Sequence, residues 1–357
     1  MFLVSSALAT PQDVRYSGFA CVGKFADIPT NFKYTSQIIN STKDKDGRSI
    51  FDKESLRFFQ GHKSSLNNFN LLLSGESSDT KISMALALTR ENVSVVNIDN
   101  VYKIVVNLGV NVVFMNFENM NITATYPLYL EYVHVMQEPP KDEDILTLLN
   151  KLYFSDDFSI FKLLEERLGN FKLKNDARLT FKIMKVDVKD EAMEKLGSYK
   201  DKIDALESIS AQKFSDFLSS RLKVSVLPYA KDYLGAKMAL SFSDGRMIEF
   251  IIPPASYGVD FILRKLTKEI YKEGIGEDAY LFGVYTTVKV YDPDLGTNYW
   301  EKKVKYGAVK NIPKLQKSTD DFAIHDEMTG LVMLEAIKEM QKDKTFYKEV
   351  VERCINK

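Results

Sequence analysis

The chain has 357 residues, of which 45% are apolar and 12% are aromatic. This composition can bury a sizeable core and excludes a chain that is disordered throughout. Lysine and arginine number 48 against 49 aspartates and glutamates, giving a formal net charge of -1. The sequence therefore has no large excess of positive charge that would attract nucleic acid or an anionic membrane surface. At roughly 150 residues per domain, the length predicts two domains.

The N-terminal residues 1–9, MFLVSSALA, form an apolar stretch with a small-x-small ending. This pattern is typical of the last part of a signal peptide, so we interpret residues 1–9 as its remnant and the protein as periplasmic or otherwise exported. A buried first strand or helix is the alternative, because no basic residue precedes the run. No later run approaches the roughly 18 apolar residues of a membrane span, so no transmembrane segment is expected. Cys21 and Cys354 either pair in an oxidising compartment or remain buried free thiols.

The first unit, residues 10–172, is predicted to begin with a strand near residues 18–27 and a helix near residues 53–73. The polar run at residues 41–48 lies between them and indicates an exposed loop. Residues 83–98 alternate apolar side chains on both sides of a polar centre, which predicts a β-hairpin.

Two long strands with one apolar face each are predicted next, at residues 102–114 and 122–130. The acidic run at residues 142–144 suits the positive N-terminal end of a helix. A second helical stretch, residues 158–168, leads to a polar segment at residues 170–177. This segment marks the expected seam between the units.

The second unit, residues 173–357, is predicted to repeat this order with a strand at residues 179–187 and a helix at residues 203–222. A hairpin follows at residues 237–252, and its Asp244-Gly245 turn tolerates positive φ angles. An inserted helix is expected at about residues 256–272, after the strand-ending pair Pro253-Pro254. The apolar residues at helical spacing in this segment are Val259, Ile262, Leu263, Leu266 and Ile270.

Two further strands are predicted at residues 280–290 and 300–308, joined by a proline- and glycine-containing turn at residues 292–296. The pair Asp320-Asp321 then opens the last helix. The hairpin sequences SMALALTRENVSVVNI (residues 83–98) and KMALSFSDGRMIEFII (residues 237–252) share Met-Ala-Leu in register. We therefore predict an internal duplication in an α+β protein: two tandem related units, each a mostly antiparallel meander with helices packed on one face.

The segment TVKVYDPDLGTNYWEKKVKY, residues 287–306, resembles the meander of periplasmic proteins related to the curli secretion lipoprotein CsgG, the TolB amino-terminal domain and the outer-membrane activators of penicillin-binding proteins. The passage KFSDFLSSRLKVSVLP, residues 213–228, resembles the helix-to-strand step before their hairpin. The turn here is one residue longer than theirs, and Thr297 follows its glycine. The resemblance implies a periplasmic, non-enzymatic protein that serves an envelope or outer-membrane assembly. It does not assign a functional role to any residue of this sequence.

No catalytic residue, cofactor or metal site is predicted from motifs, because the sequence has no Cys-x-x-Cys pair, His-Glu-x-x-His run or phosphate-cradling glycine loop. The run His325-Asp326-Glu327 could hold a metal or a general base, but residues adjacent in sequence do not share a helix face. Exposed aromatic residues favour protein contacts, so we select Tyr257, Tyr285 and Tyr291 as candidate partner contacts. Packing beneath the inserted helix is the alternative role for them.

Taken together, these features predict an exported binding or scaffolding protein that acts without catalysis on a protein partner, with homo-oligomerisation left open. A hydrolase that uses scattered carboxylates is one alternative. A small-ligand carrier with a pocket between the two units is another. A structure separates them, because a hydrolase needs convergent groups with perturbed pKa values and a carrier needs a large cavity.

Overall fold

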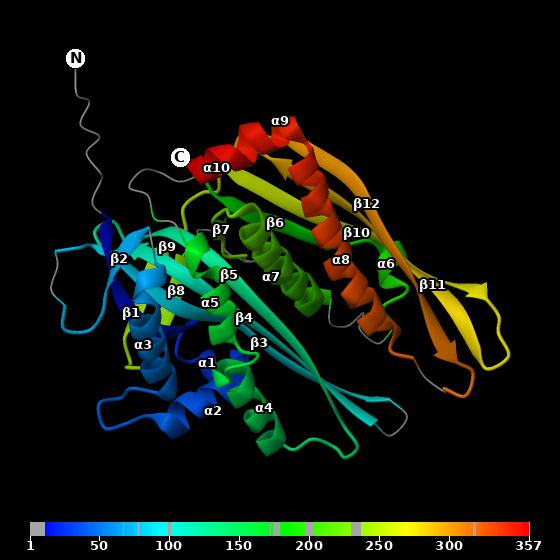
Figure 1. Cartoon of the computed structure of the whole chain (residues 1–357), viewed down its shortest axis with the longest axis horizontal. Helices are drawn as coiled ribbons and strands as arrows, with labels where there is room; N and C mark the ends of the chain where they lie inside the picture. Colours follow the sequence, from blue (N-terminus) through cyan, green and yellow to red (C-terminus); the bar gives the residue numbers. More distant parts are fainter. Residues whose placement is uncertain are drawn as a thin grey trace.

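The computed structural model describes residues 11–66, 68–76, 79–98, 101–171, 173, 179–197, 203–229, 237–316 and 319–356. The proposed signal remnant at residues 1–9 and most of the expected seam lie outside these ranges. Within them the protein is α+β, as predicted, and it contains two sheets with helices between and beside them (Figure 1).

The first sheet has the strand order β2-β1-β3-β4-β5-β9-β8. Strands β1, β2 and β3 run parallel, and β3, β4 and β5 form a long antiparallel meander. The elements of the first half of the chain are β1 (Gln12–Val22), α1 (Ile28–Asn31), α2 (Lys33–Thr42), α3 (Ile50–His62), β2 (Phe69–Leu72), β3 (Ile82–Ile98), β4 (Val101–Asn116), β5 (Asn121–Met136), α4 (Asp142–Phe154) and α5 (Ile160–Arg167).

The second sheet has the strand order β7-β6-β10-β11-β12, with β6 parallel to both β7 and β10 and a second antiparallel meander in β10, β11 and β12. This order and these directions match β2-β1-β3-β4-β5 of the first sheet. The elements of the second half are β6 (Phe181–Val188), α6 (Asp190–Met193), α7 (Ile203–Leu222), β7 (Val226–Leu227), β8 (Lys237–Phe242), β9 (Met247–Ile251), β10 (Tyr257–Lys272), β11 (Glu277–Tyr291), β12 (Asn298–Pro313), α8 (Asp321–Lys342), α9 (Lys344–Phe346) and α10 (Glu352–Asn356).

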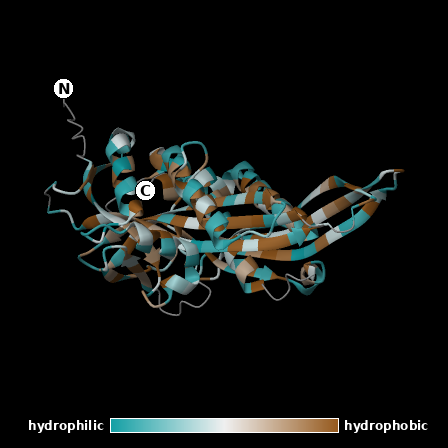
Figure 2. Ribbon diagram, turned by 90° about the horizontal axis from the view of Figure 1, so that it is seen from below, coloured by the Kyte–Doolittle hydropathy of each residue, from teal (hydrophilic) through white to brown (hydrophobic). Residues whose placement is uncertain are grey.

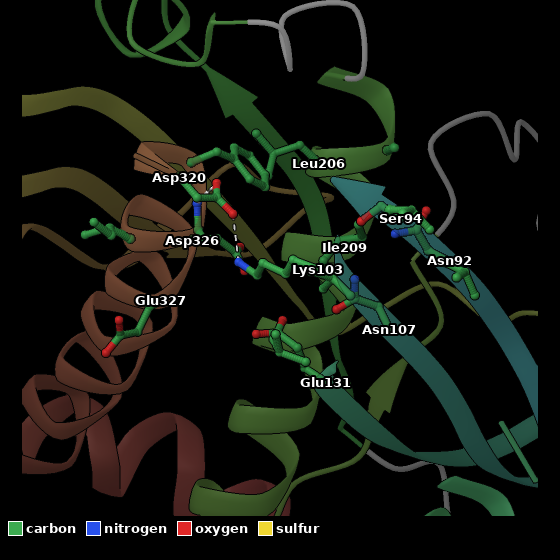
Figure 3. A pocket seen from close by; sticks show the side chains of 18 residues that line it. Asn92, Ser94, Lys103, Asn107, Glu131, Leu206, Ile209, Asp320, Asp326 and Glu327 are labelled. Carbon is green, nitrogen blue, oxygen red and sulfur yellow. Dashed lines mark hydrogen bonds and ion pairs between the residues drawn. The ribbon is translucent and has the colours of Figure 1, made fainter. Parts of the chain in front are cut away.

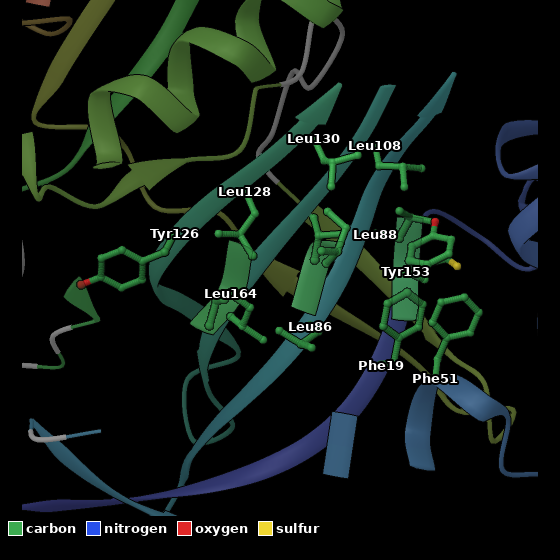
Figure 4. Packing of buried hydrophobic residues seen from close by; sticks show 14 of the residues in the cluster. Phe19, Phe51, Leu86, Leu88, Leu108, Tyr126, Leu128, Leu130, Tyr153 and Leu164 are labelled. Carbon is green, nitrogen blue, oxygen red and sulfur yellow. The ribbon is translucent and has the colours of Figure 1, made fainter. Parts of the chain in front are cut away.

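Helices α3, α4 and α5 pack on one face of the first sheet and form its main core (Figure 4). The ring of Phe51 from α3 stacks on Phe19 of β1, with centroids 4.5 Å apart, and meets the ring edge of Tyr153 from α4 at 4.7 Å. On the sheet, Leu86 and Leu88 of β3 point to these helices because they are two residues apart in a pleated strand.

Helix α7 lies between the two sheets, and its side chains are buried on both sides. Its apolar residues Phe214 and Leu218 join α8 and the second sheet in one core. Its polar residues face the first sheet, where Gln212 donates to Asn111 of β4 and Lys213 binds Glu131 of β5. The molecule therefore has four layers, in the order helices, first sheet, α7 and α8, second sheet.

The hairpin β8–β9 belongs to the second half of the chain but completes the first sheet. Strand β8 pairs antiparallel with β1, and β9 meets β5 at Asn121 and Ile251, so these strands close a ring. The hairpin covers the sheet face opposite α3–α5 and creates a third core. Its central members are Ala20, Ala85, Ala87 and Val113 of the sheet and Leu240, Phe242 and Phe250 of the hairpin.

The predicted inserted helix at residues 256–272 is wrong, because this segment is strand β10. Val259, Phe261 and Leu263 alternate into the core, and a register shift between Leu263 and Lys265 then returns Leu266 to the same face. The bulge changes the spacing of buried residues from two to three, which imitates a helical pattern.

The predicted hairpin at residues 83–98 is also wrong, since β3 is one strand paired with β4 along its length. Its polar centre holds a bulge between Leu88 and Arg90 instead of a turn. The hairpin at residues 237–252 does form, as β8–β9, so its Met-Ala-Leu match to residues 83–98 did not identify equivalent elements. The strand equivalent to β3 is β10.

The predicted helix at residues 53–73 is too long, because α3 ends at His62 and β2 occupies Phe69–Leu72. Phe69 and Leu71 are buried while Asn70 between them is exposed, which is a strand pattern. The first half also contains α2, which ends at Thr42, so the expected loop at residues 41–48 is shortened to residues 43–48. Glu91 accepts the backbone N–H groups of Tyr34 (2.8 Å) and Thr35 (2.7 Å) at the start of this helix.

The long meanders extend beyond the packed body (Figure 2). Apolar side chains near their ends are exposed. In the first sheet these are Val133 and Val135 of β5, and in the second they are Ile270 and Tyr271 of β10 with Ile275 after it. None of the helices within the described ranges is long and apolar enough to cross a membrane.

Candidate functional site

A cleft of about 600 Å³ lies between the first sheet and the N-terminal ends of α7 and α8 (Figure 3). Three strands of the first sheet form one wall, and the two helices form the other. The lining residues are Asn92–Val95 of β3, Lys103, Val105 and Asn107 of β4, Glu131 and Val133 of β5, Ala205, Leu206 and Ile209 of α7, and Asp320, Phe322–Ile324, Asp326 and Glu327 at the start of α8.

Strand register explains why these sheet residues face the same way. Ser94, Val105 and Val133 are direct cross-strand partners, and they form an outer row with apolar character. Asn92, Asn107 and Glu131 form the adjacent inner row. Because side chains alternate across a strand, both rows point away from α3–α5 and toward α7.

Lys213 of α7 lies at the inner end of the cleft, and its side chain is only 6% exposed. Its ammonium group is 2.9 Å from Glu131 Oε2 and 3.0 Å from Asp326 Oδ2, so it joins the first sheet to α8. The Tyr129 hydroxyl donates to Glu131 Oε2 at 2.7 Å and also contacts the Asn107 amide oxygen. Asn107, Glu131 and Asp326 of this group line the floor of the cleft, and Lys213 and Tyr129 hold them in place.

The two carboxylates of the floor have pKa values shifted in opposite directions. Burial would raise the pKa of Glu131, but Lys213 and the Tyr129 hydroxyl outweigh it and lower that pKa. Burial does raise the pKa of Asp326, and the attraction of Lys213 only partly opposes it. Burial would lower the pKa of Lys213, yet Asp326 and Glu131 raise it, so this lysine is charged.

A second ion pair closes one side of the cleft. Lys103 Nζ lies 2.7 Å from Asp320 Oδ2, and both side chains are largely buried. The other oxygen of Asp320 accepts the backbone N–H of Ala323 at 3.0 Å. The aspartate predicted to open the last helix therefore caps α8 and also fixes the side chain of Lys103.

The run His325-Asp326-Glu327 does not converge on one point. Asp326 and Glu327 line the cleft, whereas the His325 ring is buried against Phe282 with its Nε2 atom 3.1 Å from the Thr267 carbonyl oxygen. Within the ranges that the structure describes, no group of three or more His, Cys, Asp or Glu side chains is arranged to hold a metal ion. Cys21 and Cys354 are both unpaired thiols.

Sequence reasoning did not identify Lys213 or Glu131. Glu131 lies on the face of β5 opposite its predicted apolar face, and Lys213 directly precedes Phe214, which lies in the second core. For Lys213 the available signal was a charge at helical spacing between Ile209 and Phe217, which were predicted to face inward. The partner of each residue is more than 80 positions away, so no local pattern could pair them.

The three tyrosines selected as partner contacts occupy different environments. Tyr257 is 4% exposed and packs on Phe181 and Tyr299, so its predicted surface position is wrong. Tyr285 and Tyr291 are half-buried on the face of the second sheet opposite α7 and α8. The Tyr291 hydroxyl lies 3.1 Å from Asp260 Oδ1, and burial together with this carboxylate raises the pKa of Tyr291 to about 12. A role of Tyr285 and Tyr291 in partner binding stays a prediction.

Comparisons with known proteins give only distant similarities. No protein-family model matches the chain, and no curated protein matches it. Among solved structures, a neuraminyllactose-binding hemagglutinin homolog from Helicobacter pylori is similar, with a TM-score of 0.30 and 12% identity over 51% of this chain and 97% of the other. A minor lipoprotein from Acinetobacter baumannii has a TM-score of 0.23 and 4% identity, and it covers 48% of this chain and 95% of its own.

A lipoprotein from Caulobacter crescentus CB15 has a TM-score of 0.20 and 10% identity, and it covers 42% of this chain and 87% of its own. TM-scores this low support neither a family nor a function for the chain. The resemblance to CsgG- and TolB-like periplasmic proteins therefore stays a prediction from the sequence.

Proposed function

We propose that this chain is a non-enzymatic binding protein that holds a small amphipathic molecule in the cleft between its two sheets. The observation that carries the proposal is the cleft itself, whose volume of about 600 Å³ falls within the range that is common for small-molecule sites. It also lies between the two units, where the sequence analysis placed the pocket of a ligand carrier.

The walls and the floor of the cleft differ in chemistry. Val105 and Val133 of the sheet and Leu206 and Ile209 of α7 line the walls of the cleft. These side chains favour a ligand whose main part is apolar. The floor presents Asn107 and the carboxylates bound to Lys213, which favours hydroxyl or amine groups at one end of the ligand. A ligand with one polar end and one apolar end matches both surfaces.

A hydrolase is the second candidate, because opposed pKa shifts of two carboxylates in one cleft occur at acid–base sites. Against it, the ammonium group of Lys213 lies within 3.0 Å of both carboxylates. A charged amine held between them offsets one negative charge and favours the ionised form of both carboxylates, which opposes proton transfer from either of them. The arrangement is better suited to holding the floor rigid than to exchanging protons.

Binding of Nile red, a neutral amphiphile, tests the proposal by fluorescence titration of the whole chain. We expect saturable binding at one site, and we expect Ser94→Trp, which fills the outer row of the cleft, to weaken it at least tenfold. Val309→Trp is the matched control, because Val309 is exposed on β12 away from the cleft. Unsaturable binding, or equal affinity in Ser94→Trp and the wild type, would contradict the proposal.

The hydrolase alternative is tested separately with chromogenic ester and glycoside substrates. Activity that disappears in both Glu131→Gln and Asp326→Asn, while these proteins stay folded by circular dichroism, would replace the binding function with catalysis. Binding of Nile red without turnover of these substrates supports the proposed function.

We further propose that the protein is exported and serves an envelope assembly. The apolar N-terminal residues 1–9 and the resemblance at residues 287–306 support export, and the exposed side chains of Val135, Tyr271 and Ile275 offer apolar contacts for a protein partner. Fractionation of the source cells tests this. Recovery of the chain with periplasmic or envelope markers is expected, and recovery with cytosolic markers would contradict export.

A further inference from the structure

A second cavity lies on the other side of α7. The helix crosses the first sheet at Gly109, where an added Cβ atom would lie 2.9 Å from Thr89 Oγ1 and 3.0 Å from Gln212 Cγ. Leu206 and Ile209 line the cleft described above, whereas Gln212, one turn later, lines a separate cavity of about 340 Å³. We propose that Arg90 and this cavity form a binding site for the carboxylate or phosphate group of a small molecule.

Arg90 is a half-buried cation without an anionic partner among the described residues. Burial is the main influence on the Arg90 guanidinium and lowers its pKa. The groups that oppose this shift are the hydroxyls of Tyr129 and Tyr229, and a tyrosine hydroxyl is uncharged at pH 7. The neighbouring Glu91 also lines the cavity, but no ion pair joins it to Arg90, and its two carboxylate oxygens accept the backbone N–H groups of Tyr34 and Thr35 at the start of α2.

Two other cations near the first sheet and α7 are paired with carboxylates. Lys213 binds two of them, and Arg167 lies 3.7 Å from Asp216 Oδ1. A buried charge without a counter-ion is strongly unfavourable, because it loses hydration and gains no attraction. Arg90 has no such partner among the described residues, and the cavity that it lines has room for an anion.

The surroundings of Arg90 define the kind of ligand. A guanidinium group offers a planar pair of N–H donors that matches the two oxygens of a carboxylate or a phosphate. Thr89 and Asn31 add polar groups, while Phe32, Pro228 and Ile252 add apolar wall. The cavity therefore suits a small organic acid or phosphate ester that carries an apolar part, and the site does not depend on the cleft between the sheets.

Calorimetric titration and thermal melting of the whole chain test this site, with benzoate and inorganic phosphate as probes at constant ionic strength. We expect at least one of the two anions to bind and to raise the melting temperature beyond an equal concentration of chloride. Arg90→Met removes the charge at similar length, so we expect about a tenfold or greater loss of affinity. Benzoate binding alone would identify a carboxylate site, and phosphate binding alone would identify a phosphate site.

Two further variants make the test specific. Arg57→Met removes a highly exposed arginine of α3 and should leave anion binding unchanged. Ser94→Trp should also leave it unchanged, so failure of the cleft and failure of the Arg90 site are distinguishable. Without added anion, Arg90→Met should melt at or above the wild-type temperature because it removes an unpaired charge.

The inference is overturned if neither anion binds, if Arg90→Met binds both as tightly as the wild type, or if Arg90→Met melts several degrees lower without ligand. The last result would mean that Arg90 stabilises the fold through contacts of its own.

Discussion

Asp216 of α7 is a buried acid whose ionisation opposes folding. Burial raises its pKa from 3.8 to about 7, and the attraction of Arg167 only partly offsets this effect. A folded-state pKa above the unfolded value means that the folded protein binds the proton more tightly. Stability is therefore highest below about pH 4 with respect to this group, and it falls as the pH rises from the unfolded pKa toward the folded one.

We expect Asp216→Asn, which mimics the protonated acid, to raise the free energy of unfolding at pH 8 by a few kcal/mol, on the order of 1.4 kcal/mol for each pKa unit. The difference from the wild type should vanish only well below the unfolded pKa of 3.8, where the wild-type residue is protonated in both the folded and the unfolded state. Urea unfolding at several pH values measures it. A variant that is less stable than the wild type at pH 8 would show that the pair with Arg167 dominates.

Gly245 in the β8–β9 turn has a φ of +92°, as its Asp-Gly sequence predicted. A β-branched side chain is strained in this region, so we expect Gly245→Val to lower the free energy of unfolding by about 1–2 kcal/mol. Gly61→Ala in α3 is the control, since no atom lies within 4 Å of its added Cβ. Unchanged stability of Gly245→Val in a thermal melt would mean that the turn adopts another form.

At the scale of elements, the predictions succeeded where one face of a strand or helix is apolar and the spacing is regular. Strands β4, β5, β11 and β12 and helix α7 were placed close to their observed positions. The errors at β3 and β10 have one cause, a bulge that changes the period of buried residues within a long strand. Local periodicity cannot distinguish such a bulge from a turn or a helix, because only pairing with a neighbouring strand decides it.

The candidate site was harder to predict than the fold. A pocket between the units was one of the alternatives, but its residues come from β3, β4, β5, α7 and α8, and their meeting depends on how α7 packs on the first sheet. Asp320 was correctly assigned to a helix start, yet its contact with Lys103 spans 217 positions. Helix capping is a local property that can be predicted from the sequence. An ion pair between residues far apart in the chain depends on the fold and cannot be predicted in this way.

Gly109 controls the distance between α7 and the first sheet. A larger side chain would collide with Gln212 and Thr89, so we expect Gly109→Val to lower the free energy of unfolding by about 1–3 kcal/mol. Gln212→Ala should restore part of this loss by making room for the valine methyl groups. Chemical denaturation of the two single variants and the double variant measures the coupling, and additive losses would contradict the close approach.

For the whole molecule, the two halves of the chain cannot be separated at the predicted seam without damage to the first sheet. Residues 10–172 lack both α7 and the β8–β9 hairpin. The sheet face that carries Ala85, Ala87 and Val113 would therefore be exposed to solvent. We expect the fragment of residues 1–172 to aggregate or to bind hydrophobic dyes, and to lack a cooperative thermal transition. A soluble fragment with a sharp transition and native-like near-ultraviolet circular dichroism would show that the first unit folds alone.

The closing hairpin also has a consequence for the order in which the protein can mature. A ribosome releases the chain from its N-terminus, and Met247–Ile251 emerges more than a hundred residues after β5 ends at Met136. Throughout that interval the alanine- and valine-rich side of the nascent sheet has no cover and is open to non-native contacts. Slowing elongation before residue 251 should therefore increase misfolding, and a chaperone that shields extended apolar chains should reduce it.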